Sequence, residues 1–362
     1  MFVAKKPKVY IGISGGVDSS VSAYLLKSQG YDVYGVYLRC WNTDNGCKAE
    51  QDESDALKLA SFLEIPFEVL DFTKEYENRV MEYFYSEYEK GLTPNPDIMC
   101  NSEIKFGAFF DEITKRDPNS YLATGHYVKI GRFGNGNYAL MSGDDKKKDQ
   151  SYFLYKICNS QEKLSRILFP LGEMTKEEVR GLAASIGIPN AAKPDSQGIC
   201  FVGSVNLRQF LEKRISSSIG DVVNSDGKVI GRHNGLSYYT IGQRHGFEVN
   251  VYSSTPLYVM GKNLDDNTLV VGNKDLACRD EFSLTDVVLS VKLGEILGNN
   301  VSVRIRNLCE KIPCSISMEK FGDIKLKLNQ KVFGVASGQS GVIYSGDYLL
   351  GGGTIKDVET SP

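Results

Sequence analysis

A glycine-containing turn near the start of the chain has the composition of a phosphate site. Residues 14–20 have the sequence Ser-Gly-Gly-Val-Asp-Ser-Ser, between an apolar run of strand length at residues 9–13 and a helical pattern that ends at Gly30. Glycines let the backbone approach a ligand, and the first N–H groups of a helix carry partial positive charge. The turn lacks the lysine of G-x-x-x-x-G-K-[ST], so it predicts a cleavage of ATP unlike that of kinases and GTPases. Taken alone, a Gly-Gly turn is also ordinary structural punctuation.

Two cysteines in separate loops are candidates for thiol chemistry. Cys100 follows a proline-rich turn that presents Asp97, and Cys200 lies in a second loop with Asp195 and Gly198. The thiolate is the nucleophilic form of cysteine, and an ordinary thiol is mostly protonated at neutral pH unless its surroundings help. Taken alone, a cysteine such as Cys100 at the start of a helix is usually a small buried core residue, whereas a core segment at Cys200 would not need Asp195 and Gly198. Asp97 is a candidate acid/base or base-orienting group, or a turn residue bonded to its own backbone.

Several motifs together resemble a known family. The segment at residues 14–20 resembles the PP-loop ATP pyrophosphatases, which cleave ATP between the α- and β-phosphates to adenylate a substrate. Five further motifs are similar to the tRNA-specific 2-thiouridylase family, follow that family's order and extend the resemblance over nearly the whole chain. They are Asn95-Pro96-Asp97-x-x-Cys100-Asn101-x-x-Ile104-Lys105-Phe106, Thr124-Gly125-His126-Tyr127, Lys148-Asp149-Gln150-Ser151-Tyr152-Phe153-Leu154, Asp195-Ser196-x-Gly198-Ile199-Cys200-Phe201 and Tyr239-Thr240-Ile241-Gly242-Gln243-Arg244.

This resemblance implies a specific reaction. Enzymes of the family convert the wobble uridine (U34) of certain tRNAs to 2-thiouridine and release AMP and pyrophosphate. Transfer of AMP to the C2 oxygen turns that oxygen into a good leaving group. By similarity, Cys200 accepts a persulfide whose terminal sulfur attacks C2, and Cys100 then releases the thiolated base and leaves a transient Cys100–Cys200 disulfide. A route in which Cys100 first liberates hydrosulfide stays open.

The same resemblance implies binding residues. Many members of the family carry Met where Leu38 stands, and an apolar wall against adenine tolerates that change. Mg²⁺ is expected with the ATP phosphates, and Asp18 is either a ligand of it or a helix cap. The implied ATP contacts are Gly12, Ile13, Ser14, Gly15, Gly16, Val17, Asp18, Ser19, Leu38 and Gly125. The implied tRNA contacts are Asn95, Pro96, Asp97, His126, Lys148, Asp149, Gln150, Arg306, Asn307 and Gln339.

Two macromolecular partners follow from the resemblance. One is tRNA with a wobble-uridine anticodon, as in the tRNAs for Lys, Glu and Gln. The other is a protein that donates persulfide sulfur, either a cysteine desulfurase or a sulfur-relay protein. The remaining cysteines match no catalytic motif and are interpreted as structural or incidental: Cys40, Cys47, Cys158, Cys278, Cys309 and Cys314.

Composition excludes several classes of protein. The 362 residues are enough for two or three domains, with 41% hydrophobic and 24% charged residues as in globular proteins. No apolar run of about 18 residues and no signal-peptide pattern occurs, so no membrane partner and a cytoplasmic location are expected. Eight cysteines without a C-x-x-C pair argue against a disulfide framework and a structural zinc site. The net charge of −3 means that RNA must meet a local basic patch.

Hydrophobic periodicity predicts an α/β domain followed by β-rich domains. Strands are expected at residues 9–13, 31–38, 67–70 and 121–124, helices at 56–63, 73–90, 150–158 and 175–186, and a hairpin at 127–141. This alternation predicts a doubly wound parallel sheet, in which ligands bind at the carboxyl ends of strands. We predict a PP-loop ATP-binding catalytic domain at 1–214, a small β-rich central domain at 215–278 and a C-terminal antiparallel β-barrel at 279–362.

Two other functions agree with parts of the sequence. A PP-loop enzyme that adenylates a small acid or amide would need neither RNA nor a catalytic thiol, so its turnover would be indifferent to Cys200. In a nucleotide-sensing RNA-binding module the cysteines would serve only as packing residues, so alkylation of Cys100 would leave every activity unchanged. Both alternatives are separated from thiolation by cysteine substitution.

Overall fold

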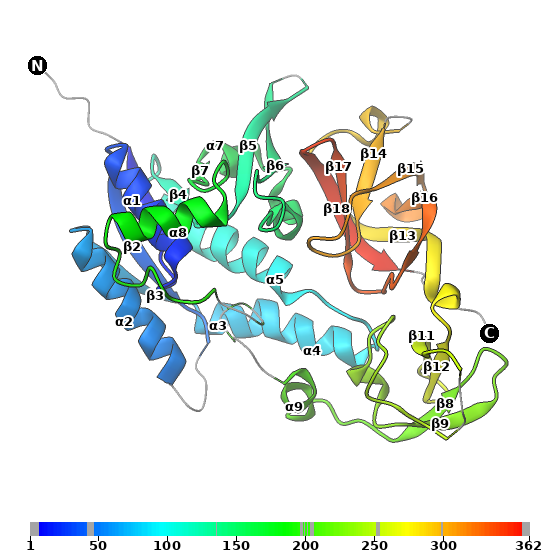
Figure 1. Cartoon of the computed structure of the whole chain (residues 1–362). Coiled ribbons are helices and arrows are strands. Elements are labelled where there is room, and N and C mark those ends of the chain that lie inside the picture. The colour runs from blue at the N-terminus through cyan, green and yellow to red at the C-terminus, as the bar shows by residue number, and fades with distance from the viewer. Residues whose placement is uncertain are drawn as a thin grey trace, which may run out of the picture. The chain divides into compact units, whose positions relative to one another are not determined.

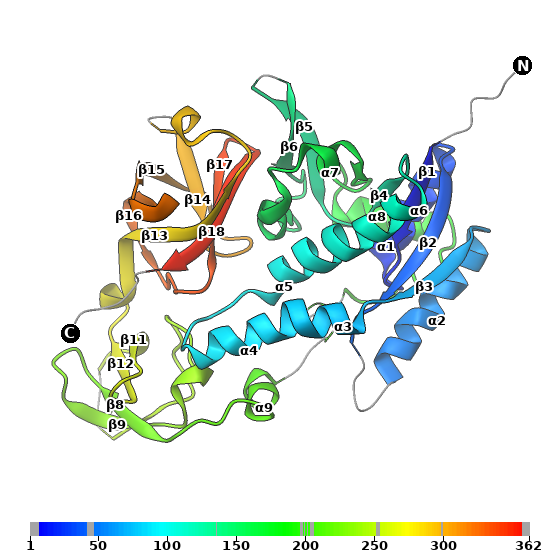
Figure 2. The same ribbon diagram turned by 180° about the vertical axis from the view of Figure 1, so that it is seen from behind.

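The computed structural model describes residues 7–41, 47–134, 136–195, 198, 200, 202, 206–250, 254–297 and 300–356 (Figures 1 and 2). The chain forms two compact units, and each is described here by itself. Unit 1 comprises Met1–Met81, Pro96–Ser204 and Asp347–Leu350. Unit 2 comprises Glu82–Asn95, Val205–Gly346 and Gly351–Pro362.

Unit 1 is built on a parallel sheet. Its five strands lie in the order β3-β2-β1-β4-β7, and every pair is parallel. The strands are β1 (Lys8–Gly12), β2 (Asp32–Arg39), β3 (Phe67–Asp71), β4 (Tyr121–Ala123) and β7 (Ile167–Leu168). The predicted fold class is therefore confirmed. The order reverses between β1 and β4, and the crevice outside such a switch point is where open α/β sheets bind ligands.

Helices and one hairpin complete unit 1. The helices α1 and α8 lie side by side in both ribbon views (Figures 1 and 2). A complete capping box at Thr175 and Glu178 begins α8, as the sequence predicts. The elements are α1 (Val17–Ser28), α2 (Cys47–Phe62), α3 (Thr73–Tyr76), a π-helical turn (Glu77–Met81), α5 (Pro96–Met99), a π-helical segment (Cys100–Ala108), α6 (Phe109–Arg116), α7 (Gln161–Ser165), α8 (Lys176–Ser185), β5 (Val128–Phe133) and β6 (Asn137–Ser142).

Two predicted helices have a different geometry. The helix expected over residues 73–90 consists of α3, the π-helical turn and α4 (Glu82–Glu89) in succession. The helix expected over residues 150–158 is a 3₁₀ helix, Ser151–Ile157. Asn135, at the centre of the predicted hairpin turn, lies outside the described residues.

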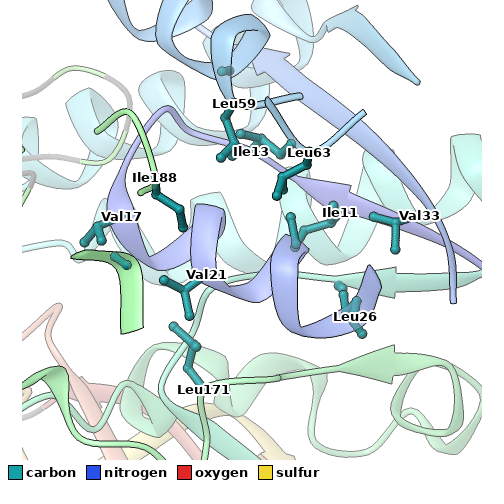
Figure 3. Packing of buried hydrophobic residues seen from close by; sticks show 14 of the residues in the cluster. Ile11, Ile13, Val17, Val21, Leu26, Val33, Leu59, Leu63, Leu171 and Ile188 are labelled. Carbon is teal, nitrogen blue, oxygen red and sulfur yellow. The ribbon is translucent and has the colours of Figure 1, made fainter. Parts of the chain in front are cut away.

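One apolar core fixes α1 against the sheet. Figure 3 shows Val21 of α1 pointing toward Leu171, with Ile13 beside Leu59 and Leu63. These side chains are almost fully buried. The burial of each such aliphatic side chain contributes about 1.5–3 kcal/mol. The core therefore fixes the turn that joins β1 to α1.

The described part of unit 2 contains two β structures, two α-helices and short 3₁₀ turns. Its first sheet has the order β10-β9-β8-β12-β11, formed by β8 (Gly220–Val223), β9 (Val229–His233), β10 (Glu248–Val249), β11 (Tyr258–Asn263) and β12 (Thr268–Gly272). Its second is a six-stranded antiparallel barrel closed by pairing of β13 with β18. The barrel strands are β13 (Cys278–Leu289), β14 (Val301–Arg304), β15 (Ile312–Met318), β16 (Ile324–Phe333), β17 (Ser340–Ser345) and β18 (Tyr348–Lys356), and the helices are α4 and α9 (Leu207–Glu212).

The two units divide the chain differently from the predicted domains. Residues 82–95 group with unit 2, where Phe84 and Tyr85 of α4 contact the ring of Phe210. Residues 347–350 group with unit 1, where Tyr348 pairs with Met141 of β6. The separation of a central from a C-terminal domain stays a prediction. None of the helices in the described ranges is both long and apolar enough to cross a membrane.

Candidate active site

The turn between β1 and α1 has the geometry of an anion site. Gly15 has φ +72°, and a Cβ there would lie 2.6 Å from the carbonyl oxygen of Asp52, so only glycine fits without strain. Gly16 is the N-cap of α1, and no side chain caps this helix end. The hydroxyl of Ser19 accepts the N–H of Ser14 at 3.2 Å and so tightens the turn. The partial positive charge of the helix N-terminus therefore faces the loop.

The end of β4 touches the same turn. A Cβ at Gly125 would lie 2.8 Å from the backbone nitrogen of Ser19 and 2.9 Å from the carbonyl carbon of Asp18. Glycine at this position thus lets the loop after β4 approach the first turn of α1. Asn190 holds the turn from the other side, since its amide donates to the Gly15 carbonyl and its Oδ1 accepts from Ser20.

Cationic side chains surround two carboxylates beside the turn. Lys176 Nζ lies 2.7 Å from Asp18 Oδ1 and 2.8 Å from Asp195 Oδ1. Asp195 also pairs with Lys148 and Arg180, each at 2.7 Å. Although burial raises the pKa of Asp195, its hydrogen bonds to Lys148 and Lys176 hold that pKa well below the usual range. The two carboxylates and three cations therefore form one cluster of ion pairs beside the turn.

The structure brings the two candidate thiols together. The Sγ atoms of Cys100 and Cys200 lie 3.5 Å apart, and both cysteines are free. Asp97 Oδ1 accepts the backbone N–H of Cys200 at 2.9 Å, and the hydroxyl of Tyr76 donates to the Cys200 carbonyl at 2.6 Å. Hydrogen bonds to both the N–H and the carbonyl of Cys200 therefore hold this residue beside Cys100.

The two thiols differ in acidity. Burial raises the pKa of Cys100 well above its usual value. The hydrogen bond from Cys100, together with Lys105, lowers the pKa of Cys200 to about 7. Burial raises the pKa of Asp97, so its carboxyl is a better proton acceptor than an exposed one. Near neutral pH, Cys200 is thus the better nucleophile of the pair.

One cavity joins the turn to Cys200. It has a volume of about 380 Å³ and lies within unit 1. Its wall includes Gly16 and Ser19 of the turn, Leu38, Lys105 and Cys200. The arrangement can hold a nucleotide phosphate and a second group that meets a thiol in the same space.

Comparison with known proteins identifies the family. Three family models match in chain order: the tRNA methyl transferase HUP domain at residues 7–204, the tRNA methyl transferase PRC-barrel domain at 208–273 and the Aminomethyltransferase beta-barrel domain at 279–355. The tRNA-specific 2-thiouridylase MnmA of Staphylococcus carnosus is 42% identical over 97% of this chain and 95% of its own length. That of Thiobacillus denitrificans is 43% identical over 96% of this chain and 99% of its own length. This chain belongs to the tRNA-specific 2-thiouridylase family.

Most of the ATP contacts that family resemblance implies lie in the cavity wall. These are Gly12, Ile13, Ser14, Gly16, Val17, Asp18, Ser19, Leu38 and Gly125. Gly15 lies in the same turn. Asp18 is also engaged by the hydroxyl of Tyr127 at 2.7 Å.

The implied tRNA contacts of the family fall on both units. Pro96, Asp97, His126, Lys148, Asp149 and Gln150 belong to unit 1, and Asn95, Arg306, Asn307 and Gln339 belong to unit 2. Of these, His126, Lys148 and Gln150 line the cavity. Burial lowers the pKa of His126 well below its usual value, so this imidazole is neutral, and its Nδ1 lies 2.8 Å from Thr124 Oγ1.

Three of these residues also have structural roles. Asp149 is fully buried, and its Oδ1 accepts the N–H groups of Gly143 and Ser151, so its carboxylate shapes the loop. Gln150 Oε1 accepts the N–H of Tyr127. Gln339 donates to the carbonyl of Thr93 within unit 2. Contacts of these residues with RNA stay predictions.

Sequence reasoning missed several residues of the site. Lys105 stands inside a quoted motif but received no role, although it lines the cavity beside Cys200. Lys176 and Asn190 carry no motif signal, because they reach the turn only through the tertiary fold. Cys40, interpreted as structural, is buried and lines the same cavity. Cys158, Cys278, Cys309 and Cys314 are not among the described residues of its wall, and the side chain of Cys47 lies outside the description.

Proposed function

We propose that the protein is a tRNA 2-thiouridylase. It uses ATP to adenylate the C2 oxygen of the wobble uridine and then replaces that oxygen with sulfur from a protein persulfide. The products are 2-thiouridine in tRNA, AMP and pyrophosphate. The single observation that supports this most strongly is the 3.5 Å separation of the Cys100 and Cys200 sulfurs, beside a cavity that both Cys200 and the glycine turn line. Membership of the family supplies the substrate class.

The glycine turn is proposed to hold the ATP phosphates. Uncapped N–H groups at the start of α1 bind phosphate oxygens, and Lys176 compensates their charge. Leu38 forms an apolar wall against the adenine. The residues fit an Mg²⁺ ion that enters with the phosphates, since Asp18 offers one carboxylate and such sites use one or two with substrate oxygens. That ion would neutralise charge on the phosphates. The described residues contain no group of three or more Asp, Glu, His or Cys side chains that could hold a metal ion without the phosphates.

The sulfur steps are proposed to use both thiols. Cys200 enters as a persulfide, and its terminal sulfur anion attacks C2 while AMP departs with the C2 oxygen. Cys100, as a thiolate, then attacks the Cys200 sulfur, which breaks the S–S bond to the base and leaves a Cys100–Cys200 disulfide with the thiolated uridine. A dithiol reductant restores both thiols. In the alternative route, Cys100 attacks the persulfide first and liberates hydrosulfide.

Asp97 is proposed to accept a proton or to orient the uridine. Its raised pKa suits proton transfer, and its contact with the Cys200 N–H places it at the thiols. A base must leave its stack to reach a site of this kind. Lys148 and the neutral imidazole of His126, both in the cavity wall, then contact the tRNA.

The partners of the reaction remain those implied by the family. We propose tRNAs for Lys, Glu and Gln as substrates and a cysteine desulfurase or sulfur-relay protein as the donor. Action on tRNA is expected in the cytoplasm. Labelled sulfur transferred from a candidate donor to Cys200 is the direct assay of the second partner.

Replacement of Cys200 tests the function. Cys200→Ala should retain tRNA-dependent exchange of ATP with pyrophosphate and yield no 2-thiouridine, measured by nucleoside mass spectrometry. Cys278→Ala, which removes a thiol of β13, is the matched control and should thiolate normally. Thiolation at a normal rate by Cys200→Ala protein would refute the mechanism. Exchange that needs a small acid or amide and ignores tRNA would instead support another PP-loop activity.

A further inference from the structure

The segment that carries Cys100 is a π-helix. It spans Cys100–Ala108, and the N–H of Phe109 donates to the carbonyl of Ile104, five residues back. In this geometry each turn contains more residues than in an α-helix, so residues five apart lie closer to one face. In an α-helix they would be about 140° apart around the axis. The π-helix therefore brings Lys105 closer to the face that carries Cys100.

A glycine makes this geometry possible. A Cβ at Gly107 would lie 2.7 Å from the carbonyl oxygen of Ser102, again five residues back. That neighbour is backbone, so it cannot rotate away. Any other residue at position 107 would force the segment to change its winding. The position of Lys105 thus depends on a residue that touches neither thiol.

Lys105 faces the reacting sulfurs. Its ammonium donates a hydrogen bond to the side chain of Cys200, and it lies in the cavity wall. Burial by itself lowers the pKa of Lys105. The neighbouring Cys200, Cys100 and Asp97 raise this pKa by more than burial lowers it, so Lys105 stays charged. Other titratable groups near this cluster are Cys40 and Tyr76, both buried, and neutral His126.

We infer that Lys105 is a positioning residue that holds the Cys200 sulfur as an anion, and that the π-helix serves to aim it. This deepens the proposed function, since the same ammonium would stabilise the terminal sulfur anion of a persulfide on Cys200. Lys105 gives up no proton and forms no covalent bond. Its contribution is electrostatic, and the low-dielectric surroundings make it larger than at an exposed site.

The inference is tested on thiol reactivity, without tRNA or ATP. The rate at which iodoacetamide alkylates Cys200 is measured from pH 5 to 10 by peptide mass spectrometry. The unmodified protein should show an inflection near pH 7. Lys105→Met should shift it upward by at least about one unit, with alkylation at least about fivefold slower at pH 7, because the thiolate fraction falls from about one half to about one tenth. Lys105→Arg keeps the charge and should restore most of the reactivity, and Lys115→Met, at an exposed position of α6, should have no effect.

A second pair of variants tests the role of the π-helix. Gly107→Ala should raise the pH of the inflection although Lys105 is retained. Gly181→Ala, in α8 where nothing lies within 4 Å of the added Cβ, should leave it unchanged. An unmodified protein whose Cys200 titrates near 9, or a Lys105→Met profile equal to the unmodified one, would overturn the inference. If Lys105→Met shifts the inflection as expected but the unmodified protein does not thiolate tRNA, the result would count against the proposed function alone.

Discussion

Substitution of Gly125 by alanine should disturb the junction between β4 and α1. The new Cβ would lie 2.8 Å from Ser19 N, 2.9 Å from the Asp18 carbonyl carbon and 3.1 Å from Ser19 Cα. An ordinary contact begins at 3.4 Å. The two backbones must therefore separate by about 0.6 Å, and overpacking of this kind costs about 1–3 kcal/mol. Because the displaced atoms include the first N–H groups of α1, ATP binding should weaken as well.

The assay combines stability with affinity. Urea unfolding should give a free energy of unfolding about 1–3 kcal/mol lower for Gly125→Ala. Calorimetric titration should give an ATP dissociation constant at least about tenfold higher, equivalent to 1.4 kcal/mol. Gly181→Ala is the control, because alanine is preferred in an open helical position by up to about 1 kcal/mol and should stabilise the protein. A Gly125→Ala protein with unchanged stability and ATP affinity would refute the close approach.

Three further predictions concern single side chains. Asp195→Asn should lower the free energy of unfolding at pH 7 by about 1–3 kcal/mol, because it leaves Lys176 with one carboxylate fewer. Because the pKa of Asp195 is lowered, the difference in stability between the two proteins should shrink at acid pH, where the carboxylate of the unmodified protein becomes protonated. The pKa of His126 is lowered by burial, so stability should fall as pH drops below about 6.5, and His126→Gln should show a smaller loss between pH 7 and 5 by thermal unfolding. Tyr76→Phe removes the hydrogen bond to the Cys200 carbonyl and should cost about 1 kcal/mol in urea unfolding.

Local signals made the outline of the fold predictable. Some elements are specified by residues that are adjacent in the sequence, and these formed as expected. They are the strand before the turn, the glycine turn itself and the capping box of α8. The strand β7 has only two residues, Ile167 and Leu168, so it leaves no periodic pattern to detect. The segment Cys100–Ala108 has only nine residues, about two turns, which is too short for its periodicity to separate a π-helix from an α-helix.

The site was predictable where one motif supplies several neighbours. The turn and the two cysteines have recognisable sequence surroundings. By contrast, Lys176 and Asn190 reach Asp18 and Gly15 of the turn, and Cys40 reaches the cavity, from segments of unrelated composition. Their roles depend on tertiary placement alone. The grouping of residues 82–95 with unit 2 has the same origin, because aromatic contacts between α4 and Phe210 are long-range in sequence.

The difference between the two thiols supports the order of events proposed for them. A donor protein needs an accessible acceptor, and Cys200 is partly exposed whereas Cys100 is fully buried. Cys100 donates a hydrogen bond to Cys200 and so lowers the pKa of the sulfur that is proposed to react first. Once that sulfur is bonded to another sulfur, its negative charge no longer opposes ionisation of Cys100, while Lys105 still faces both positions. Cys100 thus becomes easier to ionise at the step for which its thiolate is needed.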